Sequence, residues 1–529
     1  MTTRRIEAAL LVLIAAAATL FASRPIWNID VFWHIAAGDY ILTHGALPTQ
    51  DIFSAITPER SWITFQWGYE VLTHLLDQVG GLGAVRALHV AATVGAIGLM
   101  WWGCRRRLMM GPWVSIALTL LLLVLFGDRI RARPHVFNLV GWVIAMPWLM
   151  RGPALLDRKA CIGVAVTLLC WANLHAGGAL IFLIAAATLP AGAVLSRMLK
   201  RESAEEEVRR AMTWYAAALV PALASPLFIR GNIQALTTFS DHEGVIGEWQ
   251  PSWHLLTFVS GDSLGTSGLA HLLSGLAPSL VGIALVWALW RERHAQDTAS
   301  RLPPWRALLI LALVVLGHRS VRFVYVAAFA LVALAPVLRH AVSLSAPQRR
   351  LVWGTVIPAL LFASYGFNIS AQHGSIAVAA ERAFTGPHLD MRRYPTGAAD
   401  FLASTDFEGH IFCQTNWGGY LRWRLGPKVR VIADGRANFS GEVGADLAYV
   451  YDRSNLGAPD AGTQREAIYS RYDVDLIVHQ HPVWPTEYSP NRANFLRIFA
   501  DSRGEIWLRN TPRGAAYLER LNTQKEAPP

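Results

Sequence analysis

The chain has 529 residues, of which 53% are hydrophobic and only 16% are charged. In a soluble protein about a quarter of the residues are usually charged. This composition therefore excludes an ordinary soluble protein for most of the chain and indicates a membrane protein. The formal net charge of +10 does not indicate nucleic-acid binding, since Lys and Arg occur mainly in clusters between apolar runs, and we expect no nucleic-acid partner.

Residues 1–368 alternate apolar runs with short charged clusters, and we predict a polytopic α-helical membrane domain there. A membrane-spanning helix needs about 20 mostly apolar residues, and several of the runs are shorter than that. About eleven transmembrane helices are expected, over residues 6–23, 83–102, 111–127, 137–150, 160–176, 178–196, 212–229, 272–290, 305–318, 321–338 and 351–367.

The distribution of Lys and Arg predicts the sidedness of these helices, because basic residues collect in cytoplasmic loops. A cytoplasmic N-terminus places every strong basic cluster on the inner side. These clusters contain Arg105–Arg107, Arg151, Arg158, Lys159, Arg197–Arg210, Arg291, Arg293, Arg301, Arg306, Arg339, Arg349 and Arg350. An odd number of spans then puts the C-terminal region outside, so we predict an integral protein of a bacterial inner membrane with a periplasmic C-terminal domain.

Two groups of arginines fall at the outer ends of helices, against this distribution. Arg129, Arg131 and Arg133 form one group, and Arg319 and Arg322 form the other. An arginine costs about 2.5–3.5 kcal/mol at the bilayer centre and less near the interface, so its presence on the disfavoured side needs a reason. The side chains could reach lipid headgroups, or they could share an anionic ligand, since guanidinium groups match phosphate.

The first outer segment, residues 24–82, is far longer than the usual connection of about 4–6 residues. It predicts a short helix that Gly45 ends, on which Asp30 and His34 lie four residues apart on one face. A carboxylate and an imidazole together could activate an acceptor hydroxyl by proton abstraction, so both are candidate catalytic residues. A structural hydrogen bond is an equal alternative for His34.

Further polar residues stand at the outer ends of the expected helices. His175 follows the fifth span, Glu248 lies after the seventh, and His318 lies between the ninth and tenth. Their shared side makes them candidate site residues, although a helix cap or a surface position explains any one of them. His34, His175 and His318 come from distant loops without a short ligand spacing, so the signal for zinc is weak.

The C-terminal part has the composition of a soluble protein. We expect a linker over residues 369–389, an external α/β domain over residues 390–515 and a disordered tail over residues 516–529. Two polar motifs, around Trp417–Tyr420 and Asp434–Arg436, each follow a predicted strand. Open α/β sheets bind ligands at the carboxyl ends of their strands, which favours a site at these motifs. Glycine turns and helix caps explain the same residues without a ligand.

The first outer segment resembles the catalytic loop of the GT-C superfamily of membrane glycosyltransferases. That superfamily includes oligosaccharyltransferase catalytic subunits, protein O-mannosyltransferases and the lipid A aminoarabinose transferase, and it places an external Asp just after the first span. Most members carry a paired acidic motif, whereas here Asn28-Ile29-Asp30 is followed by Val31. The second acid is missing unless Asp39 or Asp51 replaces it, so a divalent metal ion is left open as a cofactor.

The soluble domain resembles that of oligosaccharyltransferases in the same way. Those enzymes carry a Trp-Trp-Asp-Tyr-Gly motif after one strand and an Asp after the next. In this chain Trp417 and Tyr420 are retained in kind, Gly418-Gly419 replaces the acidic position, and Asp434 with Arg436 follows the next strand. The resemblance implies that Trp417, Tyr420, Asp434 and Arg436 cover the site or bind an acceptor, and the lost acid argues against asparagine-linked transfer.

The GT-C resemblance implies an enzyme that transfers a sugar from a polyprenyl-phosphate lipid to a glycan, lipid or protein acceptor on the outer face of the membrane. Asp30 would deprotonate or orient the acceptor. Arg319 and Arg322, helped by Arg131 and Arg133, would bind the donor phosphate. A ligase acting on lipid-linked glycans, a transporter and a non-catalytic membrane scaffold are the alternatives. A transporter predicts inverted repeats, and none is visible.

Overall fold

The structure of the protein is a computed structural model with two compact units, each considered by itself. The first unit comprises Met1–Pro25 and Gly83–Gly386, and the second comprises Ile26–Leu82 and Pro387–Pro529. The structure describes residues 3–56, 60–152, 158–199, 204–233, 250–258, 268–294, 302–341, 345–351, 354–355, 358–359, 376–436, 442–451, 461–480 and 493–526.

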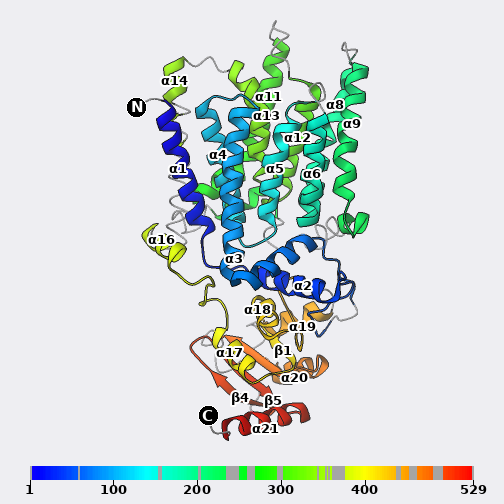
Figure 1. Cartoon of the computed structure of the whole chain (residues 1–529), viewed down its shortest axis with the longest axis vertical. Coiled ribbons are helices and arrows are strands. Elements are labelled where there is room, and N and C mark those ends of the chain that lie inside the picture. Colours follow the sequence, from blue (N-terminus) through cyan, green and yellow to red (C-terminus); the bar gives the residue numbers. More distant parts are fainter. Residues whose placement is uncertain are drawn as a thin grey trace. The chain divides into compact units, whose positions relative to one another are not determined.

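The first unit is a bundle of helices (Figure 1). Its helices are α1 (Thr3–Ala22), the later part of α3 (Trp67–Trp102), α4 (Pro112–Phe126), α5 (His135–Leu149), α6 (Arg158–Leu174), α7 (Ala176–Ala186), α8 (Thr188–Met198), α9 (Ala204–Leu223), α11 (Gly268–His294), α12 (Pro304–Arg319), α13 (Val326–Ala341), α14 (Ala346–Leu351) and α16 (Ile376–Phe384), with shorter turns at Gly103–Arg107, Gly127–Arg129, Ser252–Phe258 and Val321–Phe323. Helical structure overlaps the first ten expected spans, and the eleventh lies largely outside the described residues.

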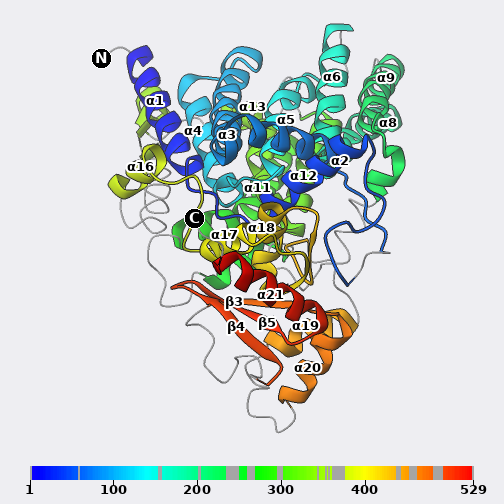
Figure 2. The same cartoon turned by 60° about the horizontal axis from the view of Figure 1, so that its bottom comes forward.

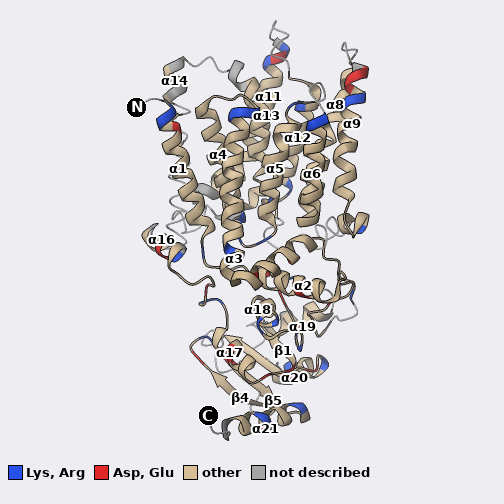
Figure 3. Ribbon diagram, viewed as in Figure 1, with Lys and Arg blue, Asp and Glu red and all other residues tan. Residues whose placement is uncertain are grey.

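The helices of this unit suit a membrane. In the described part of the chain, four helical runs are long and apolar enough to cross one: Arg4–Ala22, Trp67–Arg107, Ala176–Met198 and His271–Arg293. Figure 3 shows that Lys, Arg, Asp and Glu residues in this unit lie mainly toward helix ends, while the middle parts of the helices are mostly other residues. This is the arrangement that a bilayer requires, because burying charge in hydrocarbon is costly. The expected number of about eleven spans remains a prediction.

The second unit contains a five-stranded mixed sheet with the order β2-β1-β3-β5-β4 (Figure 2). Its strands are β1 (Gly409–Cys413), β2 (Val429–Val431), β3 (Leu476–Gln480), β4 (Phe495–Ala500) and β5 (Gly504–Arg509). Strand β1 pairs in parallel with β2 and β3, whereas β5 pairs antiparallel with β3 and β4. Its helices are α17 (Thr396–Ser404), α18 (Thr415–Leu425), α19 (Glu442–Tyr451), α20 (Ala461–Arg471) and α21 (Pro512–Glu526). The α/β character expected of this region is present.

The first outer segment belongs to the second unit rather than to the helical bundle. Its helix α2 (Asp30–His44) ends at Gly45, which adopts the left-handed conformation at φ 63°, as expected. The segment after it lies along the edge of β2, where the Val431 N–H donates to the Phe53 carbonyl at 3.2 Å and the Ala55 N–H donates to the Val431 carbonyl at 3.0 Å. Residues 26–82 of this segment therefore cluster with the C-terminal region in the structure.

Two smaller expectations about the C-terminal part also differ from the structure. Residues 376–384 of the expected linker form α16, and α21 extends as a helix to Glu526 where a disordered tail was expected from residue 516. Tyr517 and Leu521 are buried on α21. One apolar stripe is enough to hold an amphipathic helix against a folded domain.

Candidate functional site

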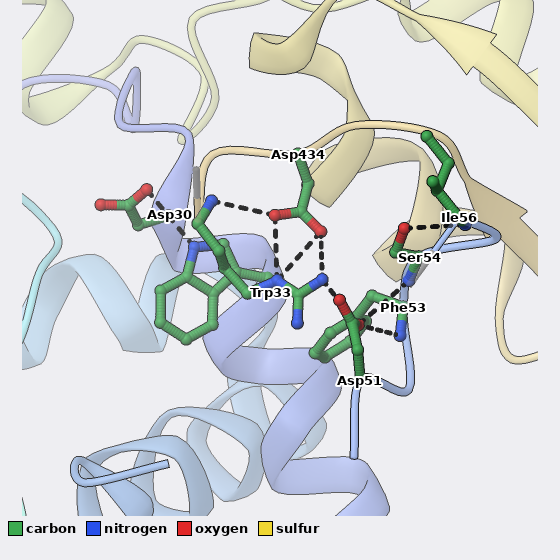
Figure 4. A network of polar contacts seen from close by, with 8 residues as sticks. Asp30, Trp33, Asp51, Phe53, Ser54, Ile56 and Asp434 are labelled. Atoms are coloured by element: carbon green, nitrogen blue, oxygen red, sulfur yellow. Dashed lines mark hydrogen bonds and ion pairs between the residues drawn. The ribbon is translucent and has the colours of Figure 1, made fainter. Parts of the chain in front are cut away.

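A buried ion-pair network in the second unit joins the first outer segment to the sheet domain (Figure 4). The Arg436 guanidinium donates from Nη2 to Asp51 Oδ1 at 2.8 Å and to Asp434 Oδ2 at 2.7 Å. Its Nε also donates to Asp434 Oδ1 at 2.9 Å, so the contact with Asp434 is bidentate. All three side chains are at most 3% exposed. Two carboxylates therefore share one cation away from solvent.

Local turns hold the two carboxylates in place. Asp434 follows β2, and its Oδ1 accepts the Arg436 backbone N–H at 2.9 Å. Asp51 Oδ1 accepts the backbone N–H groups of Phe53 at 3.0 Å and Ser54 at 3.1 Å. Both are side-chain-to-backbone turns of the kind that aspartate favours, and both orient a carboxylate toward Arg436.

The pKa values of Asp51 and Arg436 are both shifted toward the charged form. Burial raises the pKa of the Asp51 carboxyl, but the charge of Arg436 and the N–H groups of Phe53 and Ser54 outweigh burial and hold the pKa below its usual value. Burial alone would lower the pKa of the Arg436 guanidinium, and its two carboxylate partners instead raise that pKa. Asp51 and Arg436 thus keep each other ionised.

Asp30, the predicted catalytic acid, lies beside this network. It is 9% exposed at the first position of α2, and its Oδ1 accepts the indole N–H of Trp33 at 3.3 Å. A Cβ atom on Gly435 would stand 2.9 Å from Asp30 Oδ1, so the Asp434–Arg436 turn passes directly over this carboxylate. The structure therefore brings together Asp30, Asp434 and Arg436, which the sequence had assigned to separate motifs.

His34, the second predicted catalytic residue, is 1% exposed and pairs with Glu70. Its Nδ1 lies 3.3 Å from Glu70 Oε1, and Glu70 also accepts a hydrogen bond from the Thr64 hydroxyl. The His34 ring packs on the ring of Trp33 with centroids 3.6 Å apart. Asp30 and His34 thus contact the same tryptophan, and the pairing of His34 with Glu70 matches the structural alternative for this histidine.

Trp417 and Tyr420, predicted to bind an acceptor, are buried packing residues of α18. The Trp417 indole N–H donates to the Arg393 carbonyl at 2.8 Å. The Tyr420 ring packs edge-on against Phe32 with centroids 5.1 Å apart. The glycines between them explain why the acidic position is lost: a Cβ on Gly418 would stand 1.9 Å from the Ala433 carbonyl oxygen, so no longer side chain fits there.

A second polar cluster lies in the helical unit. The His135 and His175 rings have centroids 5.0 Å apart. Arg129, Arg133 and Arg322 interact electrostatically with His135, and Arg322 does so with His175 as well. Residues from three separate segments therefore concentrate positive charge in one place. Of the predicted phosphate-binding residues, Arg133 and Arg322 belong to this cluster.

The cluster is held by the local structure of its helices. His175 caps α7, where its Nδ1 accepts the Gly178 backbone N–H at 3.0 Å. A neutral His175 therefore carries its proton on Nε2. Beside it, Asn138 Oδ1 accepts the Trp171 indole N–H at 3.0 Å. The bond to Gly178 holds the ring of His175, whose centroid lies 5.0 Å from that of His135.

The other predicted site residues lie elsewhere in the unit or outside its described part. The ring of His318 contacts the hydroxyls of Ser252 at 2.9 Å and Ser279 at 3.2 Å, so it joins three segments of the bundle. Arg319 is the last residue of α12, and Arg131 is half-buried in the turn before α5. Glu248 lies outside the described residues.

Comparison with known proteins bears on the fold. No protein-family model matches the chain, and no curated protein matches it significantly. Among solved structures, the chain is similar to the archaeal oligosaccharyltransferase AglB from Archaeoglobus fulgidus, determined in complex with an inhibitory peptide and a dolichol-phosphate. The TM-score is 0.52 and the sequence identity is 12%, over 90% of this chain and 69% of AglB. The chain has a GT-C fold.

The GT-C fold confirms, at the level of the fold, the resemblance predicted from the first outer segment and the soluble domain. The superfamily resemblance had left a divalent metal open. In the described part of the chain no three His, Cys, Asp or Glu residues are grouped so that they could hold a metal ion. Asp51 and Asp434 are already bonded to Arg436, whose guanidinium occupies the position between them. The described residues of this GT-C chain therefore do not fit a metal.

Sequence reasoning missed several residues of both clusters. Trp33 and Glu70 had no role assigned, and His135 was overlooked although it ends the same "DRIRARPH" run as the predicted arginines. Its place at the outer end of an expected span was the signal that could have found it. Asp51 had been considered only as a replacement acid, and its bond to Arg436 spans 385 residues of sequence, which no local pattern reveals.

Proposed function

We propose that this chain is a membrane glycosyltransferase that transfers a sugar from a polyprenyl-phosphate-linked donor to an acceptor on the outer face of the membrane. The observation that carries the proposal is the GT-C fold, shared with AglB over 90% of the chain. The AglB structure holds a dolichol-phosphate and a peptide, that is, a polyprenyl phosphate and an acceptor-like ligand. A fold alone does not specify a reaction, so the two polar clusters supply the chemistry.

The positive cluster of the helical unit suits the donor phosphate. Arg129, Arg133 and Arg322 interact electrostatically with His135, and guanidinium groups bind phosphate oxygens with several donors at once. As the bond between the anomeric carbon and the phosphate oxygen breaks, negative charge grows on the departing polyprenyl phosphate. Fixed cations that meet this charge stabilise the transition state more than the ground state.

Asp30 suits the acceptor. The acceptor hydroxyl oxygen would attack the anomeric carbon, its proton would pass to the Asp30 carboxylate, and the polyprenyl phosphate would leave with the electron pair of the broken bond. The Trp33 indole N–H at 3.3 Å fixes the orientation of this carboxylate. Trp417 and Tyr420 would act by packing α18 beneath the Asp434–Arg436 turn, without touching the acceptor. The reaction needs no metal in this scheme.

Turnover of donor lipids tests the proposal. The purified full chain, reconstituted in lipid nanodiscs, is incubated with a panel of polyprenyl-phosphate-linked sugars and with periplasmic glycans, lipids and peptides as acceptors. Release of polyprenyl phosphate is followed by mass spectrometry. We expect Asp30→Asn to lower the rate by about 100- to 10,000-fold, the usual contribution of a positioned general base.

A matched control is available on the same helix. Asp39 lies on α2 as well, but its side chain is 55% exposed, and Asp39→Asn removes the same charge without touching the network. We expect this variant to keep the wild-type rate. Equal rates for wild type and Asp30→Asn would remove Asp30 from the mechanism, and wild-type protein without turnover of any donor would favour a non-catalytic scaffold.

A further inference from the structure

A groove opens in the helical unit where the C-terminal ends of α3 and α5 meet the turn at Gly103–Arg107. Its volume is about 100 Å³. This exceeds the ~30 Å³ share of one water molecule in the liquid, so the groove can take a short segment of an apolar chain. The lining residues are Leu99, Trp102, Arg107, Val143, Ile144, Pro147, Trp148 and Arg151. The groove therefore has an apolar floor and two arginines.

Two tryptophans hold the arginines. The Arg107 guanidinium lies 4.9 Å from the ring centroid of Trp102 and 5.5 Å from that of Trp148. The Arg151 guanidinium lies 5.3 Å from the same Trp148 ring. The Trp148 ring thus contacts both cations, and ring contacts of this kind orient a guanidinium while leaving its N–H groups available.

The fold builds this arrangement through a π-helical turn. Residues Gly103–Arg107 form that turn at the end of α3, with the Leu108 N–H donating to the Gly103 carbonyl at 2.9 Å. Gly103 allows the turn to pack closely on α5, because a Cβ there would stand 3.2 Å from Pro147 Cγ. π-Helical turns in proteins occur often at functional sites.

The basic residues of this turn do not share one role. Arg105 is bound within the protein, since its Nε donates to Glu7 at 2.8 Å and its Nη1 donates to the Met110 carbonyl at 2.7 Å. Among the residues that the structure describes, the Arg107 and Arg151 guanidinium groups have ring contacts with tryptophan and no carboxylate partner. These two cations therefore have donors to offer to a ligand.

We propose that this groove binds an anionic phospholipid, with the phosphate between Arg107 and Arg151 and part of one acyl chain along Leu99, Ile144 and Pro147. Guanidinium groups bind phosphate through several charge-assisted hydrogen bonds. Basic pockets between membrane helices on the cytoplasmic side bind lipid headgroups, and tryptophan favours the same interfacial depth. The sequence predicts a cytoplasmic position for this end of the bundle, where anionic lipids are available. The proposal is independent of glycosyl transfer.

Native mass spectrometry of the full chain tests the proposal. The protein is released from a neutral detergent and titrated with phosphatidylglycerol or with phosphatidylcholine of the same acyl chains. We expect phosphatidylglycerol to bind roughly tenfold more tightly, because both lipids carry a phosphate but only phosphatidylcholine adds a quaternary ammonium that the two arginines repel. The double variant Arg107→Gln/Arg151→Gln should lose this preference. Glycerol phosphate without acyl chains should not compete, because it cannot fill the apolar floor.

Two further variants separate a built site from general attraction. Arg106→Gln removes the same charge from the same turn, but Arg106 does not line the groove. It should keep the preference for phosphatidylglycerol. Ile144→Trp fills the floor and keeps both arginines, and it should weaken binding of the anionic lipid. Thermal unfolding of each variant reports whether the fold is intact.

Either of two results would overturn the proposal. If Arg106→Gln lowers binding as much as the double variant does, the attraction comes from the net charge of this end of the bundle. If the two lipids bind equally well to the wild type, the groove has no preference for an anionic headgroup.

Discussion

The two polar clusters of this protein are built on opposite electrostatic principles. In the second unit Arg436 is enclosed by the carboxylates of Asp51 and Asp434, and every charge in the network has an opposite charge beside it. In the helical unit Arg129, Arg133 and Arg322 gather around two histidines, so charges of the same sign are brought together. The first arrangement is typical of a structural element, and the second is typical of a site for an anionic group.

The difference in charge arrangement indicates a structural role for the first cluster and a binding role for the second. A balanced buried network holds the Asp434–Arg436 turn in one geometry, and that turn lies against Asp30. The second cluster brings several guanidinium groups near two histidines, and guanidinium groups match phosphate. We therefore expect substitutions in the first cluster to change stability and substitutions in the second to change ligand binding.

The largest expected effect concerns the centre of the balanced network. Arg436→Gln leaves two buried carboxylates without their cation, and breaking a buried pair in this way costs about 3–5 kcal/mol. The measurement is the free energy of unfolding of the purified protein in denaturant. Arg430→Gln is the control, because Arg430 lies on β2 close by and is exposed. An Arg436→Gln protein as stable as the wild type would show that the network does not stabilise the fold.

The next effect concerns the like-charge cluster. Arg322→Gln removes charge-assisted hydrogen bonds worth about 1.5–3 kcal/mol each, so binding of polyprenyl phosphate should weaken by roughly 10- to 100-fold. Equilibrium binding of the lipid to the full chain in nanodiscs measures this. Arg322→Lys keeps the charge without the planar fork and should recover part of the affinity. Unchanged binding together with lower stability would mean that Arg322 stabilises the fold and does not bind the lipid phosphate.

A smaller effect tests the contact between the turn and Asp30. Gly435→Ala places a methyl group 2.9 Å from Asp30 Oδ1 and 2.8 Å from Ile29 Cδ1, so one of these neighbours must shift. Overpacking of this kind costs about 1–2 kcal/mol. Gly462→Ala is the matched control, because a Cβ on Gly462 meets no atom within 4 Å. Thermal unfolding of both variants gives the answer, and equal melting temperatures would mean that the turn does not press on Asp30.

The smallest effect is the pH dependence of the balanced network. The pKa of Asp51 is lower in the folded protein than the usual value of 3.8, so its ion pair stabilises the fold above that value. The contribution is lost as the pH falls through the folded pKa. The difference in stability between the wild type and Asp51→Asn should therefore shrink below about pH 4, by at most ~1.4 kcal/mol per pH unit. A difference that stays constant down to pH 3 would show that Asp51 does not titrate with the network.

Much of the fold could be predicted from sequence because its signals are local. Apolar runs of the right length predicted helices at the positions where α1, α3 and α4 occur. Gly45 was expected to end the helix that begins at Asp30, and it does so in the left-handed conformation. Helix and strand formation depend on periodicity and on the conformational freedom of single residues, and both can be read within a short window.

The candidate site was predicted only in part because its contacts are not local. The sequence pointed to Asp30, Asp434, Arg133 and Arg322 as separate residues, each from its chemistry and its place beside a predicted element. It had no means of pairing Arg436 with Asp51 across 385 residues, since that contact depends on how the first outer segment packs along β2.

The sequence by itself determined that apolar helical segments precede a soluble α/β region, because hydropathy and charge can be read along the chain. Only the tertiary structure decided which charged side chains pair with an opposite charge in the Arg436 network and which arginines lie near His135. Packing turned His34 toward Glu70, and it made Trp417 and Tyr420 part of a core. The electrostatic role of a side chain depends on its neighbours in space, and those neighbours come from distant parts of the chain.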